Sequence, residues 1–336
     1  MIARHLIAFA AVALIAAPAG AQQFTMKIAS VPQKDPIEAY GNKVKQRLEA
    51  KTGGRMKVDV YPGAQLGPEP RLLDGLQLGT VEQAAFPPVY LKGLDAKFQI
   101  LEAPGVFKSM RQAHLTVNDP AIRNEFLSLL ESKNLVGGGI FAYTTIGYIA
   151  KSPLRTIDDF KGKKFRVIAS DAERGLMTAL GATGVPISLG ELTPALQTGV
   201  VDGVRSGVVI FSIFKFYTLA KYETITRDTP VIVIMFTSKP WLDKLPADLK
   251  KDVLDVSAEE TAKLDQTTTK FLNDAITGWK AGGGELVDMP AGDLAELMKR
   301  ARAVSDKLFG DDPALAPMYK KLLETAKKYE NERDPS

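Results

Sequence analysis

Two neighbouring stretches, KGKKFRVIAS (161–170) and VPISLGELTPALQTGVVDG (185–203), decide the fold of this sequence. Phe165, Val167 and Ile168 form a short apolar segment that predicts a buried strand. About twenty residues of mostly helical pattern separate it from a second strand signal at the start of the second stretch. A strand, a helix and a second strand in this order predict an α/β unit with parallel strands.

Arg166 lies inside the first of these predicted strands. A buried guanidinium is unfavourable unless an anion neutralises it. The anion can be an aspartate or glutamate of the protein, or it can be the carboxylate of a ligand. Residue type alone leaves both readings open.

The N-terminal part of the sequence repeats the same alternation. Strands are predicted at 24–30, 56–61 and 81–86, and helices at 36–52 and 69–78. This spacing favours parallel pairing with right-handed crossovers. The sequence therefore predicts a first α/β domain before the second one around Arg166.

One long helix is expected at 247–281, with apolar residues near both ends and a polar middle at about 257–270. At ~1.5 Å per residue it would extend for roughly 50 Å, which exceeds the width of one small domain. A helix with an apolar stripe at each end and a solvated centre is typical of a brace between two domains.

Residues 1–21 have the pattern of a secretory signal peptide. A basic start at Arg4 precedes an apolar run over 6–17, and Ala19-Gly20-Ala21 resembles a cleavage site. The run is too short to span a bilayer. We expect cleavage after Ala21 and a periplasmic protein that is not embedded in the membrane.

Composition excludes several classes of chemistry. The chain has no cysteine, and only His114 remains after the expected cleavage, so zinc sites of the His/Cys type and cysteine nucleophiles are excluded. The three glycines at 137–139 precede a strand-like segment rather than a helix, which argues against a dinucleotide site. A net charge of +4 gives no reason to expect nucleic acid as a partner. We expect no cofactor, no metal site and no enzymatic activity.

Six phrases of the sequence resemble the substrate-binding proteins of tripartite ATP-independent periplasmic (TRAP) transporters, of the dicarboxylate-binding type. They are GRMKVDVYPGAQLG (54–67), LQLGTVEQ (76–83), LRTIDDFKGKKFRV (154–167), ALQTGVVDG (195–203), KFYTLAKYETIT (215–226) and WLDKLPADLK (241–250). Their order and spacing cover nearly all of the expected mature chain. The resemblance implies a two-domain α/β periplasmic binding protein with hinge strands and a long bracing helix.

We expect one domain to comprise residues 22–143 and 232–270, and the other residues 144–231 and 271–336. The resemblance implies a periplasmic protein that captures an organic acid by its carboxylate and delivers it to the membrane subunits of a transporter. Two alternatives remain open, namely a periplasmic ligand sensor and a secreted lyase or isomerase on the same scaffold.

The carboxylate-binding arginine of the family falls on Arg166, which favours the ligand reading of that residue. In the sialic-acid-binding members, a second ligand arginine falls on Ile146, an asparagine on Ser206 and a ligand-stacking phenylalanine on Leu189. These replacements by apolar or shorter groups imply a smaller or more apolar monocarboxylate, such as a keto, hydroxy or aromatic acid, rather than a polyhydroxylated sugar acid.

The positions of four further residues in the predicted strands and helices indicate whether they can reach a ligand. Tyr148 shares the face of Ile146 if the strand is extended, so it either reaches the ligand or packs in the core. Tyr90 follows a strand end, where open α/β sheets bind ligands. For Arg205 we favour an ion pair at the domain surface over a ligand contact, and Arg174 is expected on the surface of a helix.

Overall fold

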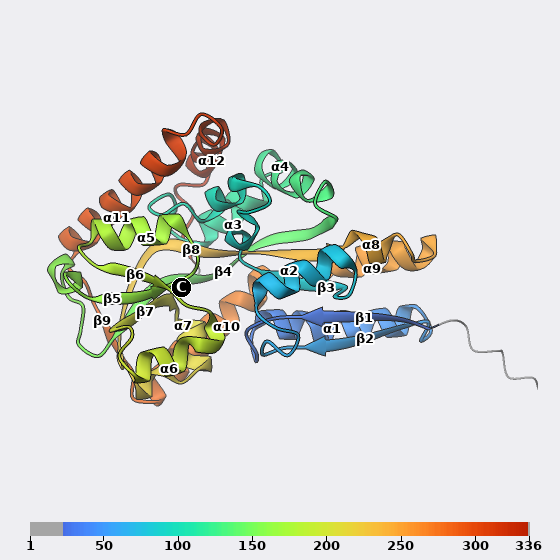
Figure 1. The fold of residues 1–336 in the computed structure, drawn as a ribbon, viewed down its shortest axis with the longest axis horizontal. Coiled ribbons are helices and arrows are strands. Elements are labelled where there is room, and N and C mark those ends of the chain that lie inside the picture. Colours follow the sequence, from blue (N-terminus) through green and yellow to red (C-terminus); the bar gives the residue numbers. More distant parts are fainter. Residues whose placement is uncertain (1–22, 335–336) are drawn as a thin grey trace, which may run out of the picture.

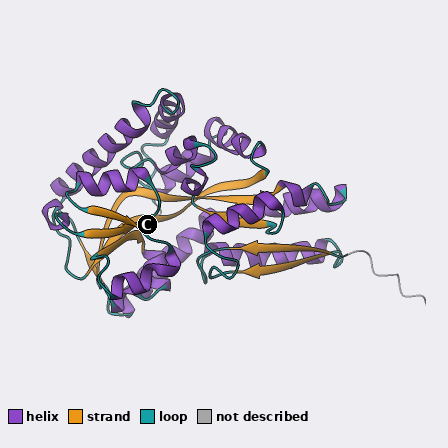
Figure 2. Cartoon of the chain, viewed as in Figure 1, coloured by secondary structure: helices purple, strands orange, loops and turns teal. Residues whose placement is uncertain are grey.

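The computed structural model describes residues 23–334, so the predicted signal peptide lies outside the described residues. Within them the chain forms one mixed sheet with helices packed on both faces (Figures 1 and 2). The strands are β1 (Phe24–Ala29), β2 (Met56–Tyr61), β3 (Gln83–Phe86), β4 (Leu135–Ala150), β5 (Lys164–Val167), β6 (Thr183–Pro186), β7 (Gly203–Gly207), β8 (Tyr222–Ser238) and β9 (Glu285–Val287). Their order is β2-β1-β3-β8-β4-β7-β5-β6, and β9 pairs with β8.

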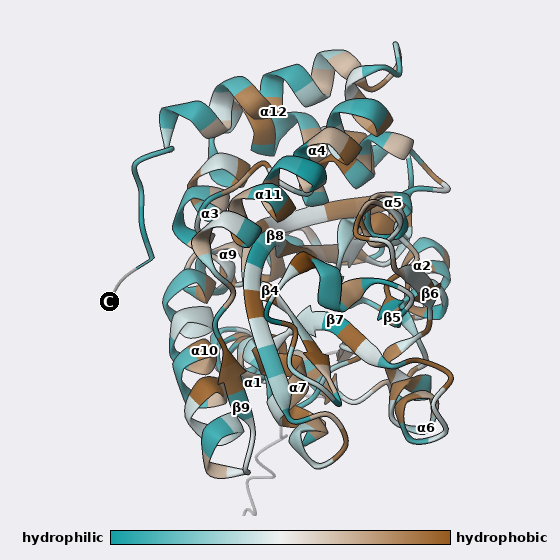
Figure 3. Ribbon diagram, turned by 90° about the vertical axis from the view of Figure 1, so that its left-hand side faces the viewer, coloured by the Kyte–Doolittle hydropathy of each residue, from teal (hydrophilic) through white to brown (hydrophobic). Residues whose placement is uncertain are grey.

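The helices alternate with these strands in both halves of the chain. They are α1 (Pro36–Lys51), α2 (Glu69–Leu78), α3 (Met110–Asn118), α4 (Pro120–Glu131), α5 (Asp171–Ala179), α6 (Leu192–Gln197), α7 (Val208–Ile213), α8 (Lys239–Leu242), α9 (Ala247–Thr261), α10 (Leu264–Ala281), α11 (Ala291–Ser305) and α12 (Ala316–Lys328). In Figure 3 many of the helices alternate between hydrophilic and hydrophobic bands, as expected of helices that bury one face.

The predicted parallel pairing of the N-terminal strands is confirmed, since β1 pairs in parallel with both β2 and β3. Helix α1 connects β1 to β2, and local sequence signals define its start. Asp35 accepts a hydrogen bond from the backbone N–H of Glu38, and Pro36 occupies the first turn, where its missing N–H is not needed.

Two long antiparallel strands, β4 and β8, run through both halves of the molecule and join them into one sheet. The apolar run at 231–237 predicts a buried strand, and β8 contains it but begins nine residues earlier, at Tyr222. The added segment is rich in polar residues, which hid it from a search for apolar runs. Several of its buried polar side chains are hydrogen-bonded instead, as when Thr224 Oγ1 donates to the carbonyl of Leu154 at 2.9 Å.

The predicted long helix is two helices, α9 and α10, which follow one another with a break at Ala262 and Lys263 (Figure 2). The backbone N–H of Lys263 bonds the carbonyl of Glu260, three residues back instead of four, so the turn tightens there. Helix α9 packs on α1 and β4, and α10 packs on α7, β4 and β9. The pair therefore braces both halves, as expected of the single helix.

The loop at Pro104 and Gly105 anchors the C-terminal helices to the sheet. Gly105 has a φ of 72° and donates its N–H to the carbonyl of Asp228 in β8 at 2.7 Å. A Cβ at this glycine would lie 2.4 Å from the backbone nitrogen of Arg302 in α11, so only glycine fits. Beyond α11 the chain crosses to α12, which packs on α3 and α4 (Figures 1 and 3).

Candidate functional site

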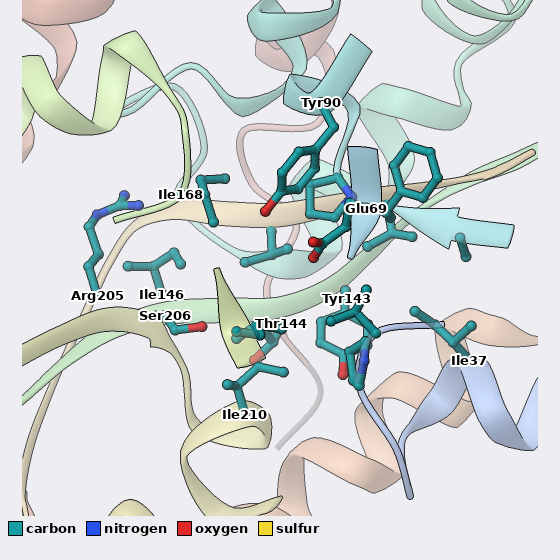
Figure 4. A pocket seen from close by; sticks show the side chains of 18 of the residues that line it. Ile37, Glu69, Tyr90, Tyr143, Thr144, Ile146, Ile168, Arg205, Ser206 and Ile210 are labelled. Atoms are coloured by element: carbon teal, nitrogen blue, oxygen red, sulfur yellow. The ribbon is translucent and has the colours of Figure 1, made fainter. Parts of the chain in front are cut away.

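A cavity lies between the two halves of the molecule, where residues from both of them meet (Figure 4). It encloses about 640 Å³ of empty space, mouth included. Its walls are mostly apolar, with side chains such as Phe86, Ile146, Ile210 and Val231. The polar groups are few, so each of them restricts what can bind.

Five of the six predicted site residues line this one cavity. Tyr90 comes from the 3₁₀ turn after β3, Ile146 from β4, Arg166 from β5, Leu189 from the turn after β6, and Ser206 from β7. In Figure 4 the Ser206 hydroxyl and the Tyr90 hydroxyl both point into the space between the surrounding elements.

Arg166 is almost fully buried, with 2% of its surface exposed. Its Nε donates to the backbone carbonyl of Ile187 at 2.8 Å. Its Nη2 has no hydrogen-bond partner among residues 23–334, and no aspartate or glutamate in that range forms an ion pair with it. The fold thus buries a permanent positive charge and leaves one face of the guanidinium open for an anion.

Arg205 also reaches the cavity wall, but its guanidinium is fully occupied. Nη1 contacts Glu173 and Nη2 contacts Asp228, while Nη2 also donates to Thr229 Oγ1 at 2.9 Å. Burial would lower the pKa of Arg205, but the negative charges of Asp228 and Glu173 raise it well above its usual value.

The expected ion pair of Arg205 is therefore present, but its expected place at a domain surface is wrong, because only 1% of the residue is exposed. Its two carboxylate partners come from α5 and β8. Sequence spacing gives no sign that three segments so far apart meet at this point.

Tyr148 does not line the cavity. It belongs to the same buried cluster as Ile146. Its ring packs edge-on against Phe160 and Phe165 at centroid distances of 4.9 and 5.6 Å. Its hydroxyl accepts from Arg205 Nε at 3.1 Å. Of the two alternatives for Tyr148, a ligand contact or core packing, the structure supports core packing.

Glu69 is a cavity residue that the sequence analysis missed. It is the first residue of α2, where an acidic side chain has an ordinary explanation in the helix dipole. Yet it is only 4% exposed, and its Oε2 has no hydrogen-bond partner in the described part of the chain. Burial raises the pKa of Glu69, an effect that the charge of Arg166 partly offsets.

A second acidic residue, Glu102, is buried near Glu173. Burial and the charge of Glu173 raise the pKa of Glu102 well above its usual value.

Of the cavity's two arginines, Arg205 is balanced by two carboxylates, while Arg166 has no ion-pair partner within residues 23–334.

A weaker ion pair crosses from one half of the molecule to the other. Lys92 Nζ lies 3.4 Å from Asp171 at the start of α5. Arg174 also contacts Asp171 from the exposed surface of α5, and this surface position is the one expected. Both pairs are partly exposed, so each contributes little to stability.

Several other features bear on function. Across residues 23–334 there is no cluster of three or more residues suited to hold a metal ion, and none of the helices there has the length and apolarity to cross a membrane. His114 lies partly buried on α3, with Nδ1 3.7 Å from Asp265, and it does not line the cavity.

Comparison with known proteins gives a consistent result. The sequence profile described as "Bacterial extracellular solute-binding protein, family 7" matches residues 28–312. The C4-dicarboxylate-binding periplasmic protein DctP of Rhodobacter capsulatus is 28% identical over 304 residues, which cover 88% of this chain and 89% of that protein.

Solved structures show the same fold. The sugar-acid-binding protein DctPAm from Advenella mimigardefordensis, in complex with galactonate, has a TM-score of 0.86 at 20% identity and covers 92% of this chain and 99% of its own. A TRAP periplasmic solute-binding protein from Shewanella oneidensis with bound succinate has a TM-score of 0.85 at 22% identity, covering 90% and 99%.

Proposed function

This chain belongs to family 7 of the bacterial extracellular solute-binding proteins, and from that premise we propose that it captures a small organic acid between its two lobes. It acts in the periplasm after removal of residues 1–21, and it delivers the acid to the membrane subunits of a TRAP transporter. Its role is binding rather than catalysis.

The observation that carries this proposal is the half-satisfied guanidinium of Arg166. The ligand carboxylate takes the open side of that group, forming a charge-assisted hydrogen bond in a site from which water is largely excluded. Arginine stays charged at every physiological pH, so capture is insensitive to pH near neutrality on the protein side.

The walls indicate which acid fits. Ile146, Leu189 and Ile210 supply an apolar surface for the body of the ligand, and Ser206 supplies one short hydroxyl. Of the two cavity arginines, Arg166 is the one with no ion-pair partner among the described residues. A monocarboxylate with a small, largely apolar body therefore fits better than a dicarboxylate or a polyhydroxylated sugar acid.

Two lobes that close on the ligand are part of this proposal. The hinge lies in β4 and β8, near residues 143–144 and 231–232. The chain passes between the lobes a third time in the α9–α10 brace, near residue 270. Of the residues 271–336 that the sequence analysis places in the second lobe, this proposal keeps 271–315 there. Helix α12 packs on α3 and α4, so we place it with the first lobe. Ligand stabilises the closed state in proportion to its preference for that state.

The test is ligand binding by the purified protein, measured by thermal shift and then by calorimetry against a panel of organic acids. At least one monocarboxylate should raise the melting temperature. Arg166→Met should weaken its binding by roughly 30-fold to 5,000-fold, the range seen when one partner of a buried charge pair is removed.

Arg155→Met is the matched control, because Arg155 is an exposed arginine of the same lobe. It should bind as the parent protein does. Unchanged affinity in Arg166→Met would refute the role of this arginine, and product formation on incubation with the bound acid would refute a purely binding role.

A further inference from the structure

The cavity contains a second buried polar group with an open position, the carboxyl of Glu69. In Figure 4 this carboxyl lies beside Tyr90 and faces the interior of the cavity. Building on the proposed function, we propose that the ligand carries a hydrogen-bond donor, a hydroxyl or an amine, in addition to its carboxylate. Glu69 accepts from that donor while Arg166 holds the acid group.

The burial of Glu69 is the first argument. A carboxyl that only complements a helix dipole can stay in water, where it needs no other partner. This one is 4% exposed, and no group in residues 23–334 hydrogen-bonds its Oε2. Burying a carboxyl oxygen without a hydrogen-bond partner is unfavourable. A ligand donor would remove that penalty on binding.

The groups around Glu69 do not fill the vacant position. Tyr90 lies beside the Glu69 carboxyl (Figure 4), but Oε2 has no hydrogen-bond partner among residues 23–334. Arg166 acts on Glu69 through its charge, and no ion pair joins them within the described chain. Glu69 and Arg166 are thus two separate open positions of opposite character on one cavity.

This arrangement defines a class of ligand. An unsubstituted monocarboxylate satisfies Arg166 and leaves Glu69 unpaired. A dicarboxylate brings its second negative charge toward a carboxyl rather than toward a free cation. A hydroxy acid or an amino acid satisfies both positions, and the apolar walls accommodate the chain that joins its two ends.

The experiment compares carboxylates that differ at a single position. Calorimetry is run with butyrate, 4-hydroxybutyrate and 4-aminobutyrate, with isovalerate, 2-hydroxyisovalerate and valine, and with benzoate, 4-hydroxybenzoate and 4-aminobenzoate. In at least one series the member with a donor should bind roughly 10-fold to 100-fold more tightly than the bare acid, as expected when a buried polar group would otherwise stay unpaired.

Two variants connect that preference to Glu69. Glu69→Leu should abolish the preference and bind the bare acid within about threefold of the parent protein. Glu69→Gln keeps the shape and an acceptor, so it should lose the preference for an amine more than that for a hydroxyl. Asp74→Asn, an exposed change on the same helix α2, should leave the preference unchanged.

The outcomes separate this inference from the proposed function. If bare and substituted acids bind equally well, and Arg166→Met abolishes both, the protein is an acid-binding protein and the role of Glu69 is refuted. A preference that persists in both Glu69 variants also refutes that role. If no carboxylate of any series binds, this inference and the proposed function both fail.

Discussion

Two buried arginines lie on neighbouring strands of one lobe and differ in their surroundings. Arg205 on β7 is held by two carboxylates, a threonine and a tyrosine. Arg166 on β5 has one backbone carbonyl, with no ion-pair partner in the described chain. Both line the same cavity. The difference is whether the protein itself supplies the anion. Glu173 and Asp228 supply it for Arg205, and in the proposed function the ligand supplies it for Arg166.

The comparison shows why residue type and burial do not by themselves identify a binding residue. A buried charge is expensive unless it is paired. For Arg205 the stabilising partners are part of the folded chain, so the pairing contributes to folding. Under the proposed function the missing partner of Arg166 is the ligand carboxylate, so that pairing contributes to affinity.

The largest effect we expect is that of Arg205→Met on stability. The change leaves the carboxylates of Glu173 and Asp228 buried without their common cation. The free energy of unfolding, measured by chemical denaturation, should fall by roughly 3–5 kcal/mol. A loss below about 1 kcal/mol would mean that the cluster is not a structural ion pair, and the contrast with Arg166 would disappear.

Glu223 gives the same comparison among acids, because it shares strand β8 with Asp228. Asp228 accepts from Arg205 and from Thr226 Oγ1, whereas Glu223 Oε2 has no partner in residues 23–334. Burial raises the pKa of Glu223 from 4.5 to about 8. The folded state therefore binds this proton more tightly than the unfolded state does.

The stability due to that proton is complete below pH 4.5 and is lost as the pH rises to about 8. The loss is about 1.4 kcal/mol for each pH unit between these values. Glu223→Gln, which cannot ionise, should be more stable than the parent protein at pH 8, and the difference should shrink toward pH 5. Parallel stability curves for the two proteins across this range would contradict the raised pKa.

Arg166→Met should change stability in the opposite direction to Arg205→Met. Both proteins are first freed of ligand by unfolding and refolding. The substitution then removes one hydrogen bond, to the carbonyl of Ile187, which destabilises the fold, and it removes an unpaired buried charge, which stabilises it. The free energy of unfolding of the variant should rise by roughly 1–2 kcal/mol. A marked loss of stability would indicate that the protein itself satisfies Arg166, and the ligand role would then lose its main support.

Much of the fold could be predicted because the α/β pattern is carried by local signals. The strand 56–61 and the helix at 69–78 are found where alternation and helical spacing put them. The early start of β8 was missed since its buried residues are polar and depend on distant partners. The break between α9 and α10 was missed because it is a tightened turn with no glycine or proline to mark it.

The site was predictable only in part, for a similar reason. Arg166 is marked by a charged residue inside an apolar strand, and the family resemblance adds Ile146, Leu189 and Ser206. Glu69 gives no such signal, because an acidic residue at a helix start is common and its burial is set by the tertiary fold. Tyr148 was ambiguous because strand alternation predicts on which side of the sheet a side chain lies, but not whether it packs in the core or reaches a cavity.

Tyr148→Phe should have the smallest effect on stability. It tests whether the ion-pair cluster around Arg205 is separate from the ligand-binding cavity. The change removes the hydroxyl that accepts from Arg205 Nε and keeps the packing against Phe160 and Phe165. The free energy of unfolding should fall by about 1 kcal/mol, as for one buried hydrogen bond. Because the ring lies outside the cavity lining, the ligand affinity should stay within about threefold of the parent value. A tenfold loss of affinity at unchanged stability would instead place the Tyr148 hydroxyl in the binding site and make the Arg205 cluster part of ligand recognition.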